Sequence, residues 1–354
     1  MDLYQNTLYM EDVRYVAALP LPWEKLRDKE VMLSGATGMI GSFFVDVILE
    51  KDRSEGLNCT VYALGRSGKR AKARFGSFAQ DPHFVFVPYD VNLPFAGSDL
   101  GDIAYILHLA SNTHPLQYST DPIGTITTNI IGLRNMLDFA AAHHAVRFAF
   151  ASSNEIYGEN RGDVELFGED YCGYINSNTM RAGYPESKRC GEALCQAYRS
   201  QKGLDVVIPR LTRTYGPTML MTDTKAISQF IKKGVAGEDI VLKSAGTQYY
   251  SYQYVADSVS GLLTVLLCGE SGAAYNIAEE HSDIMLKDLA RIIASINGKE
   301  VVFEIPDAVE AAGYSTATKA RLDGRKLQNL GWEPRYDIQS GIERTIAILK
   351  ETAE

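Results

Sequence analysis

Two pairs of side chains in this sequence have the spacing Tyr-x-x-x-Lys, which can build a general base. Residues four apart project from the same face of a helix, and an ammonium group beside a phenol lowers the pKa of the phenol. Tyr184 and Lys188 stand at the head of a predicted helix, one loop after a predicted strand that ends near Ser153. Tyr198 and Lys202 stand at the far end of the same helix, where solvated side chains are expected. We therefore expect the first pair to remove a proton from a hydroxyl group, with Ser153 hydrogen-bonded to the reacting oxygen.

A glycine-rich turn precedes these residues in the chain. The run Ser34-Gly-Ala-Thr-Gly-Met-Ile-Gly41 follows a predicted strand at 31–34 and opens a predicted helix at 39–51. Glycine allows the backbone to approach a pyrophosphate closely, and a helix N-terminus offers free N–H donors to that anion. The spacing GxxGxxG is a weak signal alone, and a turn without a ligand is the alternative, but this context predicts a dinucleotide site. Its expected contacts are Gly35, Thr37, Gly38, Met39, Ile40 and Gly41.

The end of the second predicted strand bears on which dinucleotide binds. An acidic residue there accepts hydrogen bonds from the ribose 2′-hydroxyl of NAD, whereas an arginine accommodates the 2′-phosphate of NADP. This chain has Arg66 at that point, followed by Lys69 and Arg70, and no carboxylate. We expect a tightly bound NAD or NADP, with Arg66 favouring NADP. A solvated basic loop is the alternative.

Composition and charge exclude several classes of function. The 354 residues carry a net charge of -9, so a nucleic-acid partner is not expected. No apolar run approaches the ~18 residues of a membrane span, and residues 1–28 lack the apolar core of a signal peptide. The five cysteines form no CxxC pair, which argues against a metal site and fits a reducing cytoplasm.

Short apolar runs alternate with longer amphipathic segments from Lys29 onward. This order predicts βαβ units, and hence an α/β fold with a doubly wound parallel Rossmann sheet. After Gly216 the pattern of predicted secondary structure changes to helices separated by irregular stretches. This pattern predicts a smaller C-terminal α+β lobe that binds substrate. The expected division is an N-terminal extension (1–29), a dinucleotide-binding domain (30–212, with 252–270 returning to it) and a substrate lobe (213–251 and 271–354).

Several segments together resemble the extended short-chain dehydrogenase/reductase family, which contains epimerases, dehydratases and decarboxylases of nucleotide sugars. The matching segments are Tyr184-Pro-Glu-Ser-Lys188, Asp90-Val91, His108-Leu-Ala-Ser111, Ser153-Asn-Glu-Ile-Tyr-Gly158 and Arg210-Leu-Thr-Arg-Thr-Tyr-Gly-Pro217. The resemblance implies cofactor contacts at Asp90, Val91, Leu109, Ala110, Ser111, Tyr184 and Lys188. It also implies a nucleotide-sugar substrate and a homodimer formed through the helices at 125–143 and 184–201.

Two positions depart from the family pattern. Many members have Asn where this chain has Arg213, and Arg where it has Tyr250; both positions face the nucleotide diphosphate in relatives. Moving the guanidinium from one position to the other would preserve the charge, although a different substrate is the alternative. Lys225 and Asn154 complete the expected substrate contacts.

The residues after Ser153 bear on the reaction type. Dehydratases of the family carry Asp then Glu there, whereas this chain has Asn154 then Glu155, and an amide cannot protonate a leaving hydroxyl. Decarboxylases of UDP-glucuronate have the more similar pattern, with a small polar residue and then Glu. The sequence therefore favours decarboxylation, with Glu155 as a catalytic candidate. A 4-epimerase, a 4,6-dehydratase, an NADP-dependent carbonyl reductase and a dinucleotide-sensing regulator are the alternatives.

Overall fold

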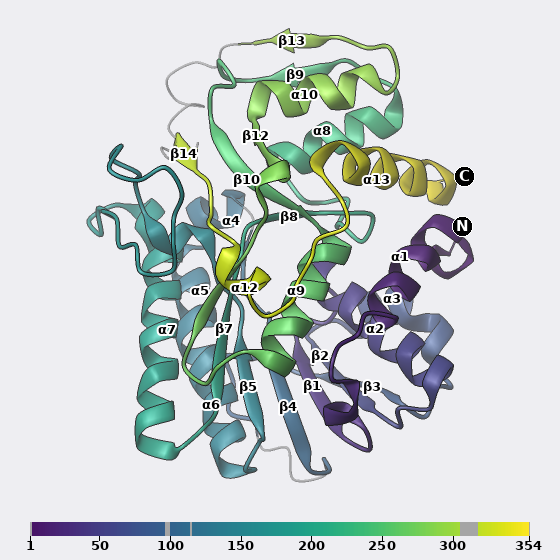
Figure 1. Cartoon of the computed structure of the whole chain (residues 1–354), viewed down its shortest axis with the longest axis vertical. Helices are drawn as coiled ribbons and strands as arrows, with labels where there is room; N and C mark the ends of the chain where they lie inside the picture. The colour runs from purple at the N-terminus through teal and green to yellow at the C-terminus, as the bar shows by residue number, and fades with distance from the viewer. Residues whose placement is uncertain (1, 96–99, 114, 305–317, 354) are drawn as a thin grey trace.

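The computed structural model describes residues 2–95, 100–113, 115–304 and 318–353. It contains a large parallel sheet, in the lower part of Figure 1, with a smaller lobe above it. The strands of the large sheet are β1 (Glu30–Ser34), β2 (Thr60–Gly65), β3 (Phe84–Pro88), β4 (Ile103–His108), β5 (Arg147–Phe150), β6 (Ser152–Ser153), β7 (Val206–Leu211) and β11 (Ala274–Ile277). Their order is β11-β7-β5-β4-β1-β2-β3, with β6 paired to β7 and every pair parallel. The order reverses direction at β1, so the predicted doubly wound fold is confirmed.

Helices cover both faces of this sheet. On one side lie α2 (Met39–Glu55) and α9 (Val255–Cys268), with α1 (Thr7–Ala17) packed against both; on the other lie α5 (Pro122–Thr127), α6 (Leu133–Ala142) and α7 (Gly183–Lys202). Successive strand residues point to opposite faces. Val31 and Leu33 accordingly join one hydrophobic core, and Met32 joins the other. Helix α3 (Gly68–Phe75) packs against the edge strand β3 and is followed by η3 (Gly76–Phe78), and α4 (Pro115–Thr120) contacts α5.

The smaller lobe is built around β10 (Tyr249–Tyr254), which pairs with β8 (Arg213–Tyr215), β12 (Asp283–Met285) and β14 (Lys319–Ala320). A separate pair joins β9 (Ile240–Leu242) to β13 (Val301–Phe303). The lobe's helices are α8 (Ala226–Ala236), α10 (Leu286–Ser295), α12 (Arg325–Gln328) and α13 (Ile338–Ala353), with η7 (Glu280–Ser282) before β12. The return to the large sheet extends past the predicted limit of residue 270, because β11 pairs with β7.

The N-terminal segment is folded onto both parts of the molecule. It consists of η1 (Leu3–Gln5), α1 and η2 (Trp23–Leu26), and the Asn6 side chain caps α1 by accepting a hydrogen bond from Tyr9 N at 2.9 Å. The buried Asp12 carboxylate accepts hydrogen bonds from the hydroxyls of Tyr254 and Tyr336 and from Arg344 of α13. The two chain ends consequently lie close together (Figure 1).

Two expected elements are interrupted. The helix predicted at 125–143 contains a π-helical turn, η4 (Thr128–Gly132), between α5 and α6. The strand predicted at 147–152 breaks at Ala151, whose carbonyl accepts a hydrogen bond from the Lys188 ammonium at 2.8 Å. Such departures from regular structure are frequent at functional sites.

Candidate active site

A cavity of about 1200 Å³ lies at the carboxyl ends of the large sheet's strands, between the sheet and the smaller lobe. This is where doubly wound folds bind ligands. All the predicted site residues line it: Gly35, Thr37, Gly38, Met39, Ile40, Gly41, Arg66, Asp90, Val91, Leu109, Ala110, Ser111, Ser153, Asn154, Glu155, Tyr184, Lys188, Arg213, Lys225 and Tyr250. Their shared position is thus a structural finding, while the individual roles stay predictions.

The glycine turn has the geometry that a pyrophosphate requires. Gly35 has a φ of 73°, and a Cβ there would lie 2.9 Å from the backbone nitrogen of Ala110. A Cβ at Gly41 would lie 2.5 Å from the Gly35 carbonyl oxygen. Helix α2 begins at Met39 with Gly38 as its N-cap, so no side chain occupies the amides of the first turn. The residues present therefore fit a dinucleotide phosphate.

The other end of the dinucleotide site is lined by Asp90 and by the basic loop after β2. The Asp90 carboxylate accepts hydrogen bonds from the backbone and side-chain nitrogens of Asn92, which hold it at the cavity wall. Arg66 and Arg70 are exposed and both line the cavity. The Ser67 hydroxyl caps α3 by accepting a hydrogen bond from Arg70 N at 3.2 Å.

Tyr184 lies in the first turn of α7, almost fully buried, and Ser153 hydrogen-bonds to it. Burial raises the pKa of Tyr184, the nearby Glu155 raises it further, and Ser153 and Arg181 act in the opposite direction. In this structure the pKa of Tyr184 is therefore raised, in contrast to the lowering that an adjacent ammonium would cause. One reason is that the Lys188 nitrogen lies 6.0 Å from the Tyr184 ring centre and is itself buried. Burial lowers the pKa of Lys188 to about 7.

A buried asparagine connects the cofactor loop to the catalytic helix. The Ser111 hydroxyl donates to Asn129 Oδ1 at 2.8 Å, and Asn129 Nδ2 donates to the Ser187 hydroxyl at 2.8 Å. Asn129 is fully buried within the π-helical turn. Because the side-chain oxygen and the side-chain nitrogen of Asn129 each have a hydrogen-bond partner, Asn129 holds α7 in a fixed position relative to the loop after β4.

Glu155 does not stand alone in the cavity. Its carboxylate accepts a hydrogen bond at 2.8 Å from Arg181 of η6 (Met180–Ala182), while Glu155 itself belongs to η5 (Asn154–Tyr157). The guanidinium of Arg181 lies 4.7 Å from the ring centre of Tyr118, and that ring stacks on Tyr184 with 4.9 Å between centres. Sequence reasoning missed Arg181 and Tyr118, because neither belongs to a recognised motif and Tyr118, on α4, reaches Tyr184 only in the folded chain.

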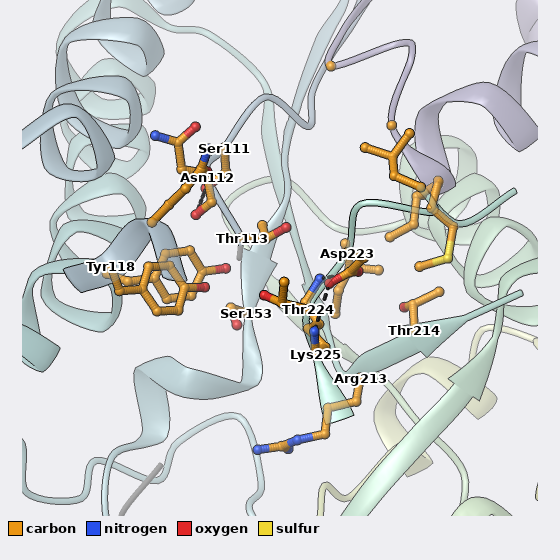
Figure 2. Close-up of a pocket in the computed structure, with 18 of the residues that line it drawn as sticks. Ser111, Asn112, Thr113, Tyr118, Ser153, Arg213, Thr214, Asp223, Thr224 and Lys225 are labelled. Atoms are coloured by element: carbon orange, nitrogen blue, oxygen red, sulfur yellow. Dashed lines mark hydrogen bonds and ion pairs between the residues drawn. The ribbon is translucent and has the colours of Figure 1, made fainter. Parts of the chain in front are cut away.

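Charged side chains from the smaller lobe line the opposite wall, which Figure 2 shows with Arg213, Asp223 and Lys225 labelled. The guanidinium carbon of Arg213 lies 3.5 Å from the ring centre of Tyr250. The Lys225 ammonium is paired at 3.1 Å with Asp223, a buried carboxylate that the sequence did not single out. Arg213 Nη1 is buried and has no hydrogen-bond partner among the described residues.

In residues 2–95, 100–113, 115–304 and 318–353, no three His, Cys, Asp or Glu side chains are grouped to hold a metal ion. Within the same ranges, no helix has the length and apolar character needed to cross a bilayer.

Comparison with known proteins adds to this geometry. The model of the NAD dependent epimerase/dehydratase family matches residues 31–278. The chain belongs to this family. The predicted family and the predicted enzyme class are thereby confirmed: this member of the epimerase/dehydratase family is an NAD-dependent enzyme.

Two relatives of this chain are both named as UDP-glucuronic acid decarboxylases. The UDP-glucuronic acid decarboxylase 1 of Xenopus tropicalis is 31% identical over 328 residues, covering 92% of this chain and 73% of that protein. The UDP-glucuronic acid decarboxylase 5 of Arabidopsis thaliana is 31% identical over 312 residues, covering 88% and 86%. The crystal structure of UDP-glucuronic acid 4-epimerase from Bacillus cereus, in complex with UDP-glucuronic acid and NAD, matches with a TM-score of 0.78 at 20% identity, covering 91% of this chain and 99% of that chain. The structural match supports the fold.

Proposed function

We propose that this enzyme decarboxylates a nucleotide-activated uronic acid, with UDP-glucuronate as the first candidate, through transient oxidation at C4 of the sugar. The observation that carries the proposal is the run Ser153-Asn154-Glu155 beside Tyr184. Glu155 lines the cavity, and the Asn154 amide cannot act as a general acid. The names of the two relatives at 31% identity support it.

The chain's own residues would act first at the C4 hydroxyl. Tyr184 takes the hydroxyl proton, and Ser153 holds the oxygen by a hydrogen bond. When bound, the nicotinamide supplies a hydride acceptor for C4 and a hydride donor at the end of the cycle. The Lys188 nitrogen, fixed by its bond to the Ala151 carbonyl, lies 6.0 Å from the centre of the Tyr184 ring.

Decarboxylation then follows from the position of the new ketone. A C4 ketone is β to the C6 carboxylate, so the C5–C6 bond breaks, neutral carbon dioxide leaves, and the electron pair moves into an enolate at O4. Ser153 and the protonated Tyr184 stabilise that oxygen by hydrogen bonds. C5 then takes up one proton, C4 is reduced again, and the product is a nucleotide pentose.

Dehydration fits the site less well. Loss of the C6 hydroxyl as water requires an acid next to a base, and the buried Asn154 amide cannot supply that proton. Epimerisation at C4 is the second candidate, because it needs only Ser153, Tyr184 and Lys188 and a cavity in which the ketone can turn over.

The finer features of the proposal concern cofactor, assembly and location. Arg66 and Arg70 at the cavity edge favour NADP over NAD, since arginine binds a phosphate through paired hydrogen bonds.

A homodimer through the helices at 125–143 and 184–201 is supported by the exposed side chains of Ile126 and Ile131. All five cysteines are free thiols, which supports a cytoplasmic location.

Purified enzyme incubated with UDP-glucuronate and NAD or NADP tests the proposal. We expect release of carbon dioxide and a product with the mass of a UDP-pentose. Conversion of UDP-glucuronate or a UDP-hexose to its C4 epimer, without carbon dioxide, would replace decarboxylation by epimerisation.

A further inference from the structure

Arg181 lies on the side of the cavity where the reacting carbon must be. It stands three residues before Tyr184 and lines the same cavity. Its charge lowers the pKa of Tyr184, against the larger rise that burial and Glu155 impose on that pKa. Both its guanidinium and the Tyr184 ring contact the Tyr118 ring, at 4.7 Å and 4.9 Å from the Tyr118 ring centre.

The hydrogen bonds of Arg181 leave part of its guanidinium uncommitted. Nη2 donates to Glu155 at 2.8 Å, whereas Nη1 is buried and has no hydrogen-bond partner among the described residues. A guanidinium normally grips a carboxylate with two parallel hydrogen bonds. A buried charged N–H without a partner is costly, so a second anion at this place would be stabilised.

The covalent structure of a sugar nucleotide decides between the two cavity arginines. In a pyranose, C6 is two bonds from C4, so its substituent lies beside the hydroxyl that Tyr184 deprotonates. The diphosphate is attached at C1, on the opposite side of the ring. Arg181 lies at Tyr184, whereas Arg213 lies over Tyr250 and acts electrostatically on Tyr252, in the smaller lobe. Arg213 is therefore placed for the diphosphate and Arg181 for the group on C6.

We infer that Arg181 binds the C6 carboxylate of the substrate and selects nucleotide uronic acids over neutral nucleotide hexoses. This inference rests on the proposed function and names the residue that recognises its substrate class. Glu155 shares the same guanidinium, so two carboxylates compete for one cation while the substrate is bound. Loss of neutral carbon dioxide ends that competition. A bidentate hydrogen-bonded pair between Arg181 and the substrate carboxylate would instead stabilise the bound substrate before reaction and slow decarboxylation.

The test compares a uronic acid with a neutral sugar on the same nucleotide. UDP-glucuronate and UDP-glucose are titrated by calorimetry into NAD-loaded protein that carries Tyr184→Phe, so that no turnover occurs. Addition of Arg181→Gln is expected to weaken UDP-glucuronate binding about 10–100-fold and to leave UDP-glucose binding within about twofold. Arg181→Lys, which keeps the charge, recovers part of the loss. Glu155→Gln removes the competing carboxylate and is expected to tighten UDP-glucuronate binding.

Other outcomes would overturn the assignment. If Arg181→Gln weakens both ligands equally or neither, Arg181 has only a structural role. If Glu155→Gln leaves UDP-glucuronate binding unchanged or weaker, the two carboxylates do not share the guanidinium. The proposed function is judged separately, by carbon dioxide release from the wild-type enzyme. An enzyme that releases none, yet loses uronate-specific affinity in Arg181→Gln, would refute decarboxylation and keep the role of Arg181.

Discussion

The guanidinium of Arg213 lies over the ring of Tyr250, with 3.5 Å between the guanidinium carbon and the ring centre. These are the two positions at which the sequence departs from the family pattern. Their contact brings the guanidinium on β8 to the residue of β10 at which the resemblance leads us to expect an arginine in many family members. The contact agrees with the expectation that the guanidinium has moved from one position to the other, and a cation over an aromatic ring is held in a defined orientation.

This relationship predicts a reciprocal rescue. Arg213→Asn is expected to weaken UDP binding about 10–100-fold, since a charge-assisted hydrogen bond is lost. Adding Tyr250→Arg restores the family arrangement and is expected to recover most of the affinity. Calorimetric titration of both variants with UDP measures the effect. A double variant that binds no better than Arg213→Asn would show that the two positions are not interchangeable.

The two Tyr-x-x-x-Lys pairs predict opposite effects of the same substitution. Tyr184→Phe keeps the ring in its stack but removes the base, so turnover should fall ~10²–10⁴-fold while cofactor binding is retained. Tyr198→Phe is the matched control, because Tyr198 lies at the other end of α7 and its hydroxyl bonds to Asp138, which does not line the cavity. Equal turnover in the two variants would remove Tyr184 from the mechanism.

Cofactor choice is predicted to depend on Arg66. Arg66→Ala should weaken NADP binding about 10–100-fold and change NAD binding little, because only NADP carries the 2′-phosphate. Lys69→Ala is the control, since Lys69 has similar charge and exposure but does not line the cavity. Titration of the wild type and of both variants with NAD and with NADP measures these affinities. A wild-type enzyme that strongly prefers NAD would contradict this prediction.

The buried ammonium of Lys188 predicts a pH-dependent gain of stability when it is removed. Burial lowers its pKa from 10.5 to about 7 in the folded protein. Between these values the unfolded chain binds more protons, so the free energy of unfolding rises with pH through this window. Below pH 7 both states carry the proton and the folded protein bears the full cost of the buried charge.

Lys188→Met should therefore stabilise the cofactor-free protein at pH 6 by roughly 2–4 kcal/mol, after the lost bond to Ala151 is counted. The gain should shrink toward pH 10.5. Urea unfolding at several pH values measures it, with the exposed Lys202→Met as control. A variant that is less stable than the wild type at pH 6 would mean that the ammonium is well solvated in the fold.

Local patterns made much of the site predictable. The turn at Gly35–Gly41 and the pair Tyr184 and Lys188 are short segments whose spacing reflects one turn or one helix face, so they could be identified before folding was known. Alternating apolar runs likewise predicted the parallel sheet. The strand β10 (Tyr249–Tyr254) was missed, although the alternation of the tyrosines at 250, 252 and 254 with Ser251 and Gln253 is typical of a strand.

Features that depend on contacts between distant loops were not predictable. Arg181, Tyr118 and Asp223 have no signature spacing, and each becomes part of the site only through the packing of separate elements. The rise that burial imposes on the pKa of Tyr184 was not predictable for the same reason. Spacing indicates which charges are near a phenol, but the degree of burial is set by the whole fold.

The most direct test of decarboxylation uses UDP-glucuronate labelled with ¹³C at C6, in deuterated water with NAD or NADP. Cleavage of the C5–C6 bond with proton uptake at C5 predicts that the label appears as ¹³CO₂. It also predicts that the UDP-pentose gains one deuteron at C5, measured by mass spectrometry and NMR. Retention of the ¹³C label in a sugar nucleotide inverted at C4 would contradict the proposed decarboxylation.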